Sequence, residues 1–290
     1  MKNTSRILNR AYVEIGNLCN LSCSFCPGTR RTGKQMTASE FRTVAEKLRP
    51  HTDYLYLHVM GEPLFHPELD AILSVAGALG FCVCITTNGT LLDASADLLL
   101  SHAAVLHKVS ISLHSMEGNG AESSLRDYLT SAVSFARRAA AKGIYTVFRL
   151  WNLDTASRAG QNSENTAIEA FLHASFPEEW TARQNGFCID RNVFLEYAGI
   201  FTWPIESDAE EVEDGYCHGL IDQIAVLADG TVVPCCLDSE GEIALGNLFR
   251  TDLPAILSSP RAVSMREGFR SRKMTEKLCR TCTYARRFRK

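Results

Sequence analysis

The sequence predicts an α/β protein built on a parallel β-sheet, with a smaller second part towards its C-terminus. Short apolar runs alternate with amphipathic stretches of helical period six times before residue 200, which is the pattern of βαβ units with right-handed crossovers. Six units are too few for a closed eight-stranded barrel. We therefore expect an open, partial (β/α)6 barrel over residues 1–206, although the period alone does not exclude a doubly wound sheet.

The expected elements follow in order along the chain. Strands are expected at residues 11–15, 54–59, 81–86, 109–114, 144–150 and 192–197. The first helix starts at a capping box from Thr37 to Glu40 and places Phe41, Val44 and Leu48 on one face. Further helices are expected at 69–79, from a cap at Asp93 to Leu100, at 124–142 and at 168–176, with a polar loop over 152–166.

Composition narrows the class of protein. Of the 290 residues, 46% are hydrophobic and 22% charged, with a net charge of −3, so nothing in the charge indicates nucleic-acid binding. We find neither a signal peptide nor a run of about 18 apolar residues, so we expect no membrane contact and a cytoplasmic location. There the eleven cysteines stay reduced and are more typical of metal ligands than of disulfides.

Three cysteines, Cys19, Cys23 and Cys26, follow the first expected strand with the spacing C-x3-C-x2-C. An odd number of thiols in so tight a loop cannot form a disulfide framework, but three thiolates can converge on one metal centre. On a cubane of four irons they leave one iron open; a zinc loop or chance clustering is the alternative. With Phe25 before the last cysteine, the motif resembles that of the radical S-adenosylmethionine (SAM) family, whose fold is a partial (β/α)6 barrel.

A second, smaller domain is expected over residues 207–290. An acidic linker at 207–215 precedes a β-hairpin at 223–234 and a helix from 253 towards 269. The spacing of Cys217, Cys235, Cys279 and Cys282 resembles the SPASM and twitch extensions of radical SAM enzymes, above all the twitch arrangement of the 2-deoxy-scyllo-inosamine dehydrogenase type. That resemblance implies one auxiliary [4Fe–4S] cluster; a four-thiolate zinc site stays open. The other cysteines are not assigned to the metal sites: Cys236 is expected to be a non-ligand, Cys82 and Cys84 to lie in a strand, and Cys188 to lie in a loop region, as buried filler or a reactive thiol.

The same resemblance implies a set of SAM-binding residues. In this sequence the matching positions are Phe25, Gly61, Glu62, Asn88, Ser112, His114 and Arg149. Met60 stands where the family often has its first glycine, a change that a backbone contact tolerates. A polar residue at a strand end is otherwise often only solvated or capping. We name no catalytic base, although proton-accepting groups occur at His58, His66, His114, Glu196 and Tyr197.

The resemblance also implies the chemistry. A first [4Fe–4S] cluster would bind SAM, cleave it reductively and yield a 5′-deoxyadenosyl radical that abstracts a substrate hydrogen, with flavodoxin or ferredoxin as the reductant. A fully ligated auxiliary cluster would take up an electron, so oxidation of a small-molecule alcohol is favoured. A peptide maturase that forms thioether or other crosslinks is the alternative, although we expect no room for a peptide-recognition domain before residue 11. A non-catalytic iron–sulfur electron carrier is the remote alternative.

Overall fold

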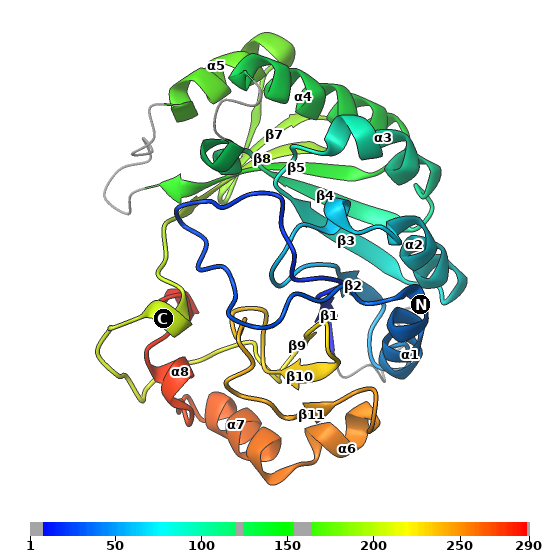
Figure 1. Ribbon diagram of the computed structural model, residues 1–290. Helices are drawn as coiled ribbons and strands as arrows, with labels where there is room; N and C mark the ends of the chain where they lie inside the picture. Colours follow the sequence, from blue (N-terminus) through cyan, green and yellow to red (C-terminus); the bar gives the residue numbers. More distant parts are fainter. Residues whose placement is uncertain (1–7, 120–123, 154–163, 289–290) are drawn as a thin grey trace. The chain divides into compact units, whose positions relative to one another are not determined.

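The computed structural model of the protein describes residues 8–119, 124–153 and 164–288, which form two compact units (Figure 1). The first unit contains residues 1–19, 27–82 and 201–290, and the second contains residues 20–26 and 83–200. The predicted boundary at residues 206 and 207 stays a prediction.

The strands of the first unit are β1 (Arg10–Val13), β2 (Tyr54–Tyr56), β9 (Gln223–Val226), β10 (Thr231–Val233) and β11 (Gly246–Asn247). They lie in the order β11-β10-β9-β1-β2. Strand β1 runs parallel to β2 on one side and to β9 on the other, so that Tyr12 faces both Tyr56 and Ala225. The predicted hairpin at 223–234 is confirmed as β9 and β10, which pair antiparallel. The sequence did not show that this hairpin extends the barrel sheet.

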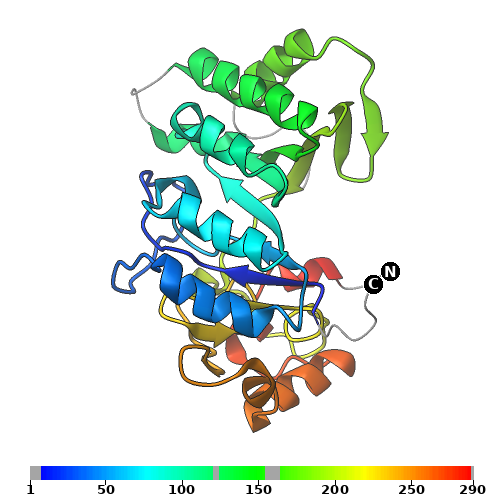
Figure 2. The same ribbon diagram turned by 90° about the vertical axis from the view of Figure 1, so that its right-hand side faces the viewer.

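Helices of the first unit are α1 (Ala38–Leu48), α2 (Leu69–Ala78), α6 (Leu253–Leu257), α7 (Pro260–Arg270) and α8 (Lys277–Arg280). Figures 1 and 2 show α1 and α2 side by side, and the two helices are in contact. The capping box is confirmed: the Thr37 side chain accepts from the Glu40 amide, and the Glu40 carboxylate accepts from the Thr37 amide. The prediction of one helix from 253 to 269 is wrong. Pro260 has no amide hydrogen to continue α6, and the Ser259 side chain caps a new helix.

Four strands of the second unit run parallel in chain order: β3 (Cys82–Thr87), β4 (Leu106–Ser112), β5 (Tyr145–Leu153) and β8 (Val193–Gly199). Strands β6 (Thr181–Arg183) and β7 (Gly186–Asp190) add an antiparallel extension beyond β8. Helices α3 (Leu92–Ser101), α4 (Leu125–Ala141) and α5 (Glu164–Ser175) accompany these strands. Figures 1 and 2 show α3 beside α4, and α4 beside α5, as their contacts also indicate.

Several predicted boundaries in the second unit are wrong. Helix α3 begins at Leu92 after an N-cap at Leu91, so Asp93 lies in the first turn and is not the cap. Strand β5 continues to Leu153, and α5 begins at Glu164, so the predicted loop at 152–166 is shorter at both ends. Its residues 154–163 lie outside the described part of the chain. His114 follows β4 in a 3-10 segment, Leu113–Asn119.

The parallel strands have two faces with different chemistry. In β4, the apolar Val109 and Ile111 lie on one face and the polar Ser110 and Ser112 on the other, and of these four only Ser112 is partly exposed. This alternation is expected of a sheet with helices on one side only. The predicted α/β class is confirmed, with parallel strands β1 and β2 in one unit and β3, β4, β5 and β8 in the other. No helix among the described residues is long and apolar enough to cross a membrane.

Candidate functional site

The cysteine loop, residues 19–26, leaves β1 through a stem of two chain segments, residues 14–17 and 31–36. The Met36 amide donates to Ile15 O at 2.7 Å, and the Asn17 amide donates to Lys34 O at 3.1 Å. The Asn17 side chain donates to Thr32 O at 3.0 Å and accepts from the Lys34 amide at 2.7 Å. Cys19 and Cys26 are exposed and Cys23 is half-buried. The stem thus fixes both ends of a loop whose thiols stay accessible.

Gly61 and Glu62 lie against the start of this loop. Gly61 has φ +77°, and a Cβ at this position would lie 2.4 Å from Gly16 O and 2.8 Å from Leu18 O. The next amide, that of Glu62, donates to Leu18 O at 2.9 Å, and the Glu62 carboxylate accepts from the Leu64 amide at 2.9 Å. A glycine is therefore required here by conformation and by close backbone approach. The role of Gly61 and Glu62 towards SAM stays a prediction.

The second unit holds the part of the loop at residues 20–26 against the ends of β3 and β4. The Asn88 side chain donates to Asn20 Oδ1 at 2.9 Å, and Asn20 donates to Thr90 Oγ1 at 2.9 Å. Asn88 Oδ1 accepts from the Thr90 amide and hydroxyl, at 2.9 and 2.8 Å. Asn88 was predicted as a SAM contact; in the structure it positions the loop, and its role towards SAM stays a prediction.

Phe25 and His114 also meet at this end of the sheet. Their ring centroids are 4.8 Å apart, and the Cys23 thiol lies 3.8 Å from Ser115 O, just beyond His114. His114 Nδ1 lies 3.1 Å from Arg149 O and 3.4 Å from the amide nitrogen of Trp151. The structure therefore brings two of the predicted SAM-binding residues together beside the cysteine loop.

Ser112 and Arg149 are neighbours in register on β4 and β5, and Arg149 is in turn opposite Glu196 on β8. Arg149 Nη1 donates to Thr86 Oγ1 at 3.3 Å, and its Nε lies 4.0 Å from Glu196 Oε2. The guanidinium carbon lies 4.4 Å from the centroid of the Trp151 ring. This places a cation towards the carboxyl ends of parallel strands, where such sheets bind ligands.

The other proton-accepting candidates have structural partners. Burial lowers the pKa of His66, whose Nδ1 accepts from the Glu68 amide at 3.1 Å. Tyr197 donates to Glu169 at 2.9 Å, and burial together with that carboxylate raises the pKa of Tyr197. The His58 ring packs against Tyr12, with centroids 5.3 Å apart. None of these arrangements identifies a catalytic base.

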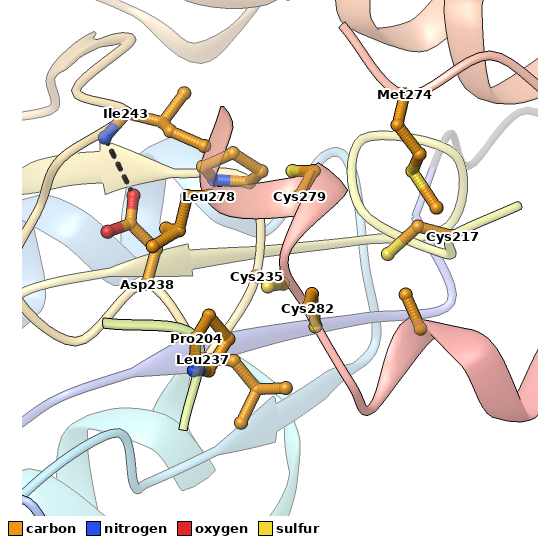
Figure 3. Close-up of a pocket in the computed structure, with 12 residues that line it drawn as sticks. Pro204, Cys217, Cys235, Leu237, Asp238, Ile243, Met274, Leu278, Cys279 and Cys282 are labelled. Atoms are coloured by element: carbon orange, nitrogen blue, oxygen red, sulfur yellow. Dashed lines mark hydrogen bonds between the residues drawn. The ribbon is translucent and has the colours of Figure 1, made fainter. Parts of the chain in front are cut away.

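The four C-terminal cysteines line a single pocket (Figure 3). Cys217 precedes β9, Cys235 follows β10, Cys279 lies in α8 and Cys282 follows it. The rest of the lining is apolar apart from Asp238: Pro204, Pro234, Leu237, Ile243, Met274, Leu278 and Ala285. The Asp238 carboxylate is turned to the backbone, accepting from the Glu242 and Ile243 amides at 2.9 Å each. Widely separated segments therefore deliver four thiols to an apolar space.

The chemistry of this pocket suits an iron–sulfur cluster. Burial raises the pKa of Cys217 to about 11 and raises those of Cys235, Cys279 and Cys282 above their usual range. The thiols keep their protons until metal charge stabilises the thiolates. Among the described residues, no three or more His, Cys, Asp or Glu side chains are arranged to hold a metal ion. Four cysteine thiolates that line one pocket are the ligand set of a [4Fe–4S] cubane, in which each thiolate binds a different iron.

The remaining cysteines lie elsewhere in the two units. Cys236 packs beside Tyr12, Tyr56 and Trp203 in an apolar cluster of the first unit and does not line the four-cysteine pocket. Cys82 and Cys84 lie in β3, and Cys84 is buried. The Cys188 thiol on β7 lies 3.3 Å from Asp190 O.

Two features of the site were missed from the sequence. One is Asp238, which shapes the loop after Cys235. The other is an ion pair between Glu14 and Arg31 at the base of the cysteine-loop stem. A charged residue inside the apolar run Val13-Glu14-Ile15 was the available signal for that pair, because a carboxylate in a buried run needs a partner. Nothing local identifies Arg31.

Comparison with known families agrees with this geometry. Residues 13–173 match the model of the radical SAM superfamily, and residues 217–283 match the SPASM model, an iron–sulfur cluster-binding domain. The first match covers more than half of the chain. The protein belongs to the radical SAM superfamily, so its cofactors are SAM and a [4Fe–4S] cluster, with an auxiliary cluster in the SPASM region.

Solved structures with the same fold carry different bound molecules. BtrN in complex with AdoMet and 2-DOIA superposes with a TM-score of 0.60 at 18% identity, over 96% of this chain and 94% of BtrN. Streptococcus suis SuiB bound to its precursor peptide SuiA gives 0.62 at 14% identity, over 97% of this chain and 72% of SuiB. The enzyme anSMEcpe with bound AdoMet and Cp18Cys peptide gives 0.60 at 13% identity, over 94% of this chain and 88% of that one. At such identities the likeness shows the fold alone.

Curated relatives match only part of the chain. A probable GTP 3′,8-cyclase from Methanocella arvoryzae is 32% identical over 114 residues, 39% of this chain and 36% of that protein. The 7-carboxy-7-deazaguanine synthase of Neisseria meningitidis is 31% identical over 78 residues, 27% of this chain and 35% of that protein. The chain therefore spans about a third of the length of the curated relatives it matches.

Proposed function

We propose that the protein is an oxidoreductase that dehydrogenates a secondary alcohol of a small polar molecule. When bound, the cofactors supply one-electron cleavage of SAM to methionine and a 5′-deoxyadenosyl radical, which takes a hydrogen atom from the substrate carbon. The substrate then loses a proton from its hydroxyl and one electron to become a ketone. Atoms and charge balance only if the protein holds an acceptor for that electron.

The four-cysteine pocket is the observation that carries this proposal. Cys217, Cys235, Cys279 and Cys282 supply as many thiolates as a cubane has irons, so no iron is left to bind a substrate. A cluster saturated with protein ligands and set among apolar side chains suits electron transfer. This ligand count, and not the substrate of any relative, supports oxidation as the net reaction.

The three-cysteine loop and the sheet residues have separate tasks in the proposal. Cys19, Cys23 and Cys26 hold the cluster that leaves one iron for SAM. We assign Arg149 to the SAM carboxylate, because a guanidinium presents a planar fork of donors, and Ser112 to its ribose. Gly61, Glu62, Asn88, Phe25 and His114 complete the proposed SAM contacts.

A peptide maturase is the second candidate. Similarity in fold to SuiB with its precursor peptide and to anSMEcpe with a bound peptide supports it. The two candidates differ in the product: a dehydrogenase removes two hydrogens and forms a carbonyl, whereas a crosslinking maturase joins two side chains. A flavodoxin or ferredoxin as the reductant is a proposal common to both.

Deuterium transfer decides between them. The reduced, reconstituted full chain is incubated with SAM and a panel of deuterated candidates: carbinol-deuterated cyclitols and aminocyclitols, ribose-deuterated GTP, and cysteine-containing peptides with deuterated side chains and α-carbons. We expect deuterium in 5′-deoxyadenosine only with an alcohol, together with a carbonyl product that hydroxylamine traps. Deuterium transfer from a peptide with formation of a crosslink would overturn the proposal in favour of the maturase.

A further inference from the structure

A buried ion pair lies where the stem of the cysteine loop meets the SPASM region. Glu14 follows β1 and its side chain has no exposed surface, while that of Arg31 is 16% exposed. The guanidinium is bidentate, with Nη1 donating to Glu14 Oε2 at 2.8 Å and Nη2 to Oε1 at 2.6 Å. Burial acts to lower the pKa of Arg31, but the hydrogen bonds to Glu14 and the charge of Glu14 raise the pKa of Arg31 above its usual value. Paired in this way, two buried charges are tolerated.

The Glu14 carboxylate also collects two backbone donors. The Met60 amide donates to Oε1 at 3.2 Å, immediately before the Gly61 turn. The Ala228 amide donates to Oε2 at 2.9 Å, from the turn of the hairpin β9–β10. The Glu14 carboxylate therefore links the stem of the cysteine loop to the turn at Gly61 and to the β9–β10 hairpin of the SPASM region.

Arg31 completes the link on the other side. Its Nε donates to Ser239 O at 2.8 Å, and the preceding Arg30 amide lies 3.2 and 3.3 Å from the two carboxylate oxygens of Glu240. Ser239 and Glu240 belong to the short loop that begins at Cys235, where the Asp238 amide donates to Cys235 O at 3.2 Å. A path of backbone and hydrogen bonds thus connects a pocket cysteine with the stem of the cysteine loop.

We propose that Glu14 and Arg31 are positioning residues that couple the four-cysteine pocket to the stem of the cysteine loop, from which Cys19 projects. Residues 235–240, which begin at the pocket residue Cys235, hold Arg31, and the ion pair with Glu14 fixes the stem from which Cys19 projects. The coupling holds whichever substrate the enzyme takes, because none of these contacts involves one. Its failure and that of the proposed dehydrogenation are therefore distinguishable.

The test measures SAM affinity without turnover. SAM binds the open iron of the loop cluster, so titration of the reduced protein, followed by the change in its electron paramagnetic resonance spectrum, gives a Kd. We expect Glu14→Gln and Arg31→Lys to raise this Kd about tenfold or more, since neither keeps the charged, bidentate pair. Asp53→Asn removes an ion pair to Arg49 with a 3.0 Å contact in the same unit and should leave the Kd unchanged.

A double-mutant cycle tests the coupling itself. Cys279→Ser with Cys282→Ser prevents assembly of the auxiliary cluster and should also raise the Kd for SAM. Adding Glu14→Gln to that variant should then have little further effect, because both changes release the same stem. Effects that multiply, or an unchanged Kd in Glu14→Gln and Arg31→Lys at full iron content, overturn the proposal.

Measuring the iron content of each variant distinguishes an effect on the cysteine loop from a general loss of folding. Selective loss of about four irons per chain from Glu14→Gln or Arg31→Lys, with the auxiliary cluster retained, supports the proposal because the loop alone has failed. Loss of both clusters in both variants, while Asp53→Asn keeps them, would assign the pair to folding alone and refute the proposed coupling.

Discussion

Gly61 shows what a single residue contributes to this site. The family resemblance marked the position as a SAM contact, and the structure adds a reason that is independent of any ligand. Its φ is +77°, and the carbonyl oxygens of Gly16 and Leu18 occupy the space that a Cβ would need. A side chain would therefore push the glycine turn away from the segment that leads into Cys19.

Gly61→Ala should destabilise the protein and weaken SAM binding together. We expect a loss of about 1–3 kcal/mol from backbone strain alone, and more from the 2.4 Å contact with Gly16 O. Chemical denaturation and a SAM titration provide the two measurements. Gly143→Ala is the matched control, because Gly143 has φ +83° but nothing within 4 Å of the added Cβ. Equal losses in both variants would show that the contact is unimportant.

Cys235 and Cys236 are adjacent but have different surroundings. Cys235 lines the four-cysteine pocket, whereas Cys236 packs beside Tyr12. We expect Cys235→Ser to lower the iron content by about four per chain and Cys236→Ser to leave it unchanged. Iron analysis of the two reconstituted variants checks this. A loss of iron in Cys236→Ser would show that Cys236 is a ligand and would contradict this prediction.

At the scale of elements, α1 shows how local chemistry fixes a boundary. The Glu40 amide donates to Thr37 Oγ1 at 3.1 Å, the Thr37 amide to Glu40 Oε2 at 2.8 Å, and Lys34 Nζ to Glu40 Oε1 at 2.8 Å. Because Lys34 is part of the cysteine-loop stem, the cap also links the helix to the stem. Thr37→Ala should cost about 1 kcal/mol of unfolding free energy.

The charge of Glu40 gives this element a defined pH dependence. Partial burial acts to raise the pKa of Glu40, but hydrogen bonds from Lys34 and Thr37 lower it below its usual value. A carboxyl with a lowered folded-state pKa stabilises the fold above its unfolded pKa, about 4.3, and this contribution is lost as pH falls through the folded value. Glu40→Gln should therefore flatten the decline in stability below about pH 4.3. Thermal unfolding of Glu40→Gln and of the unaltered protein across pH measures this difference.

Sequence periodicity was sufficient for the parallel strands and insufficient for their extensions. Runs such as Val109 to Ser112 can be recognised as strands because apolar and polar residues alternate along them. Strand β6 was missed because all of Thr181–Arg183 is exposed, which leaves no alternation to detect. Pairing of β9 with β1 joins residues more than 200 positions apart, and no local pattern encodes such a contact.

At the scale of the whole molecule, some parts of the candidate site could be predicted from the sequence and others could not. Cysteine spacing predicted that Cys217, Cys235, Cys279 and Cys282 come together, and the structure places all four around one pocket. The role of both cysteine sets as metal ligands stays a prediction. The position of Glu14 and Arg31 could not be predicted from the sequence. Besides each other, these two residues bind backbone groups at Met60, Ala228 and Ser239, which no sequence pattern identifies. Their importance depends on how the chain folds and not on residue type.

The presence of two cysteine sets predicts that SAM cleavage and product formation can be separated by mutation. In the variant that combines Cys279→Ser and Cys282→Ser, the loop at Cys19, Cys23 and Cys26 is intact, so SAM cleavage should continue once SAM is added to saturation. In the proposed dehydrogenation the substrate radical would then lack its electron acceptor, and the ketone should fall at least about tenfold relative to 5′-deoxyadenosine. Mass spectrometry of both products measures this ratio in one reaction. The ratio cancels any change in SAM affinity, which the stem coupling predicts, because fewer cleavage events lower both products equally. An unchanged ratio would mean that the electron leaves by another route, and the four-cysteine pocket would then serve only to hold the stem in place.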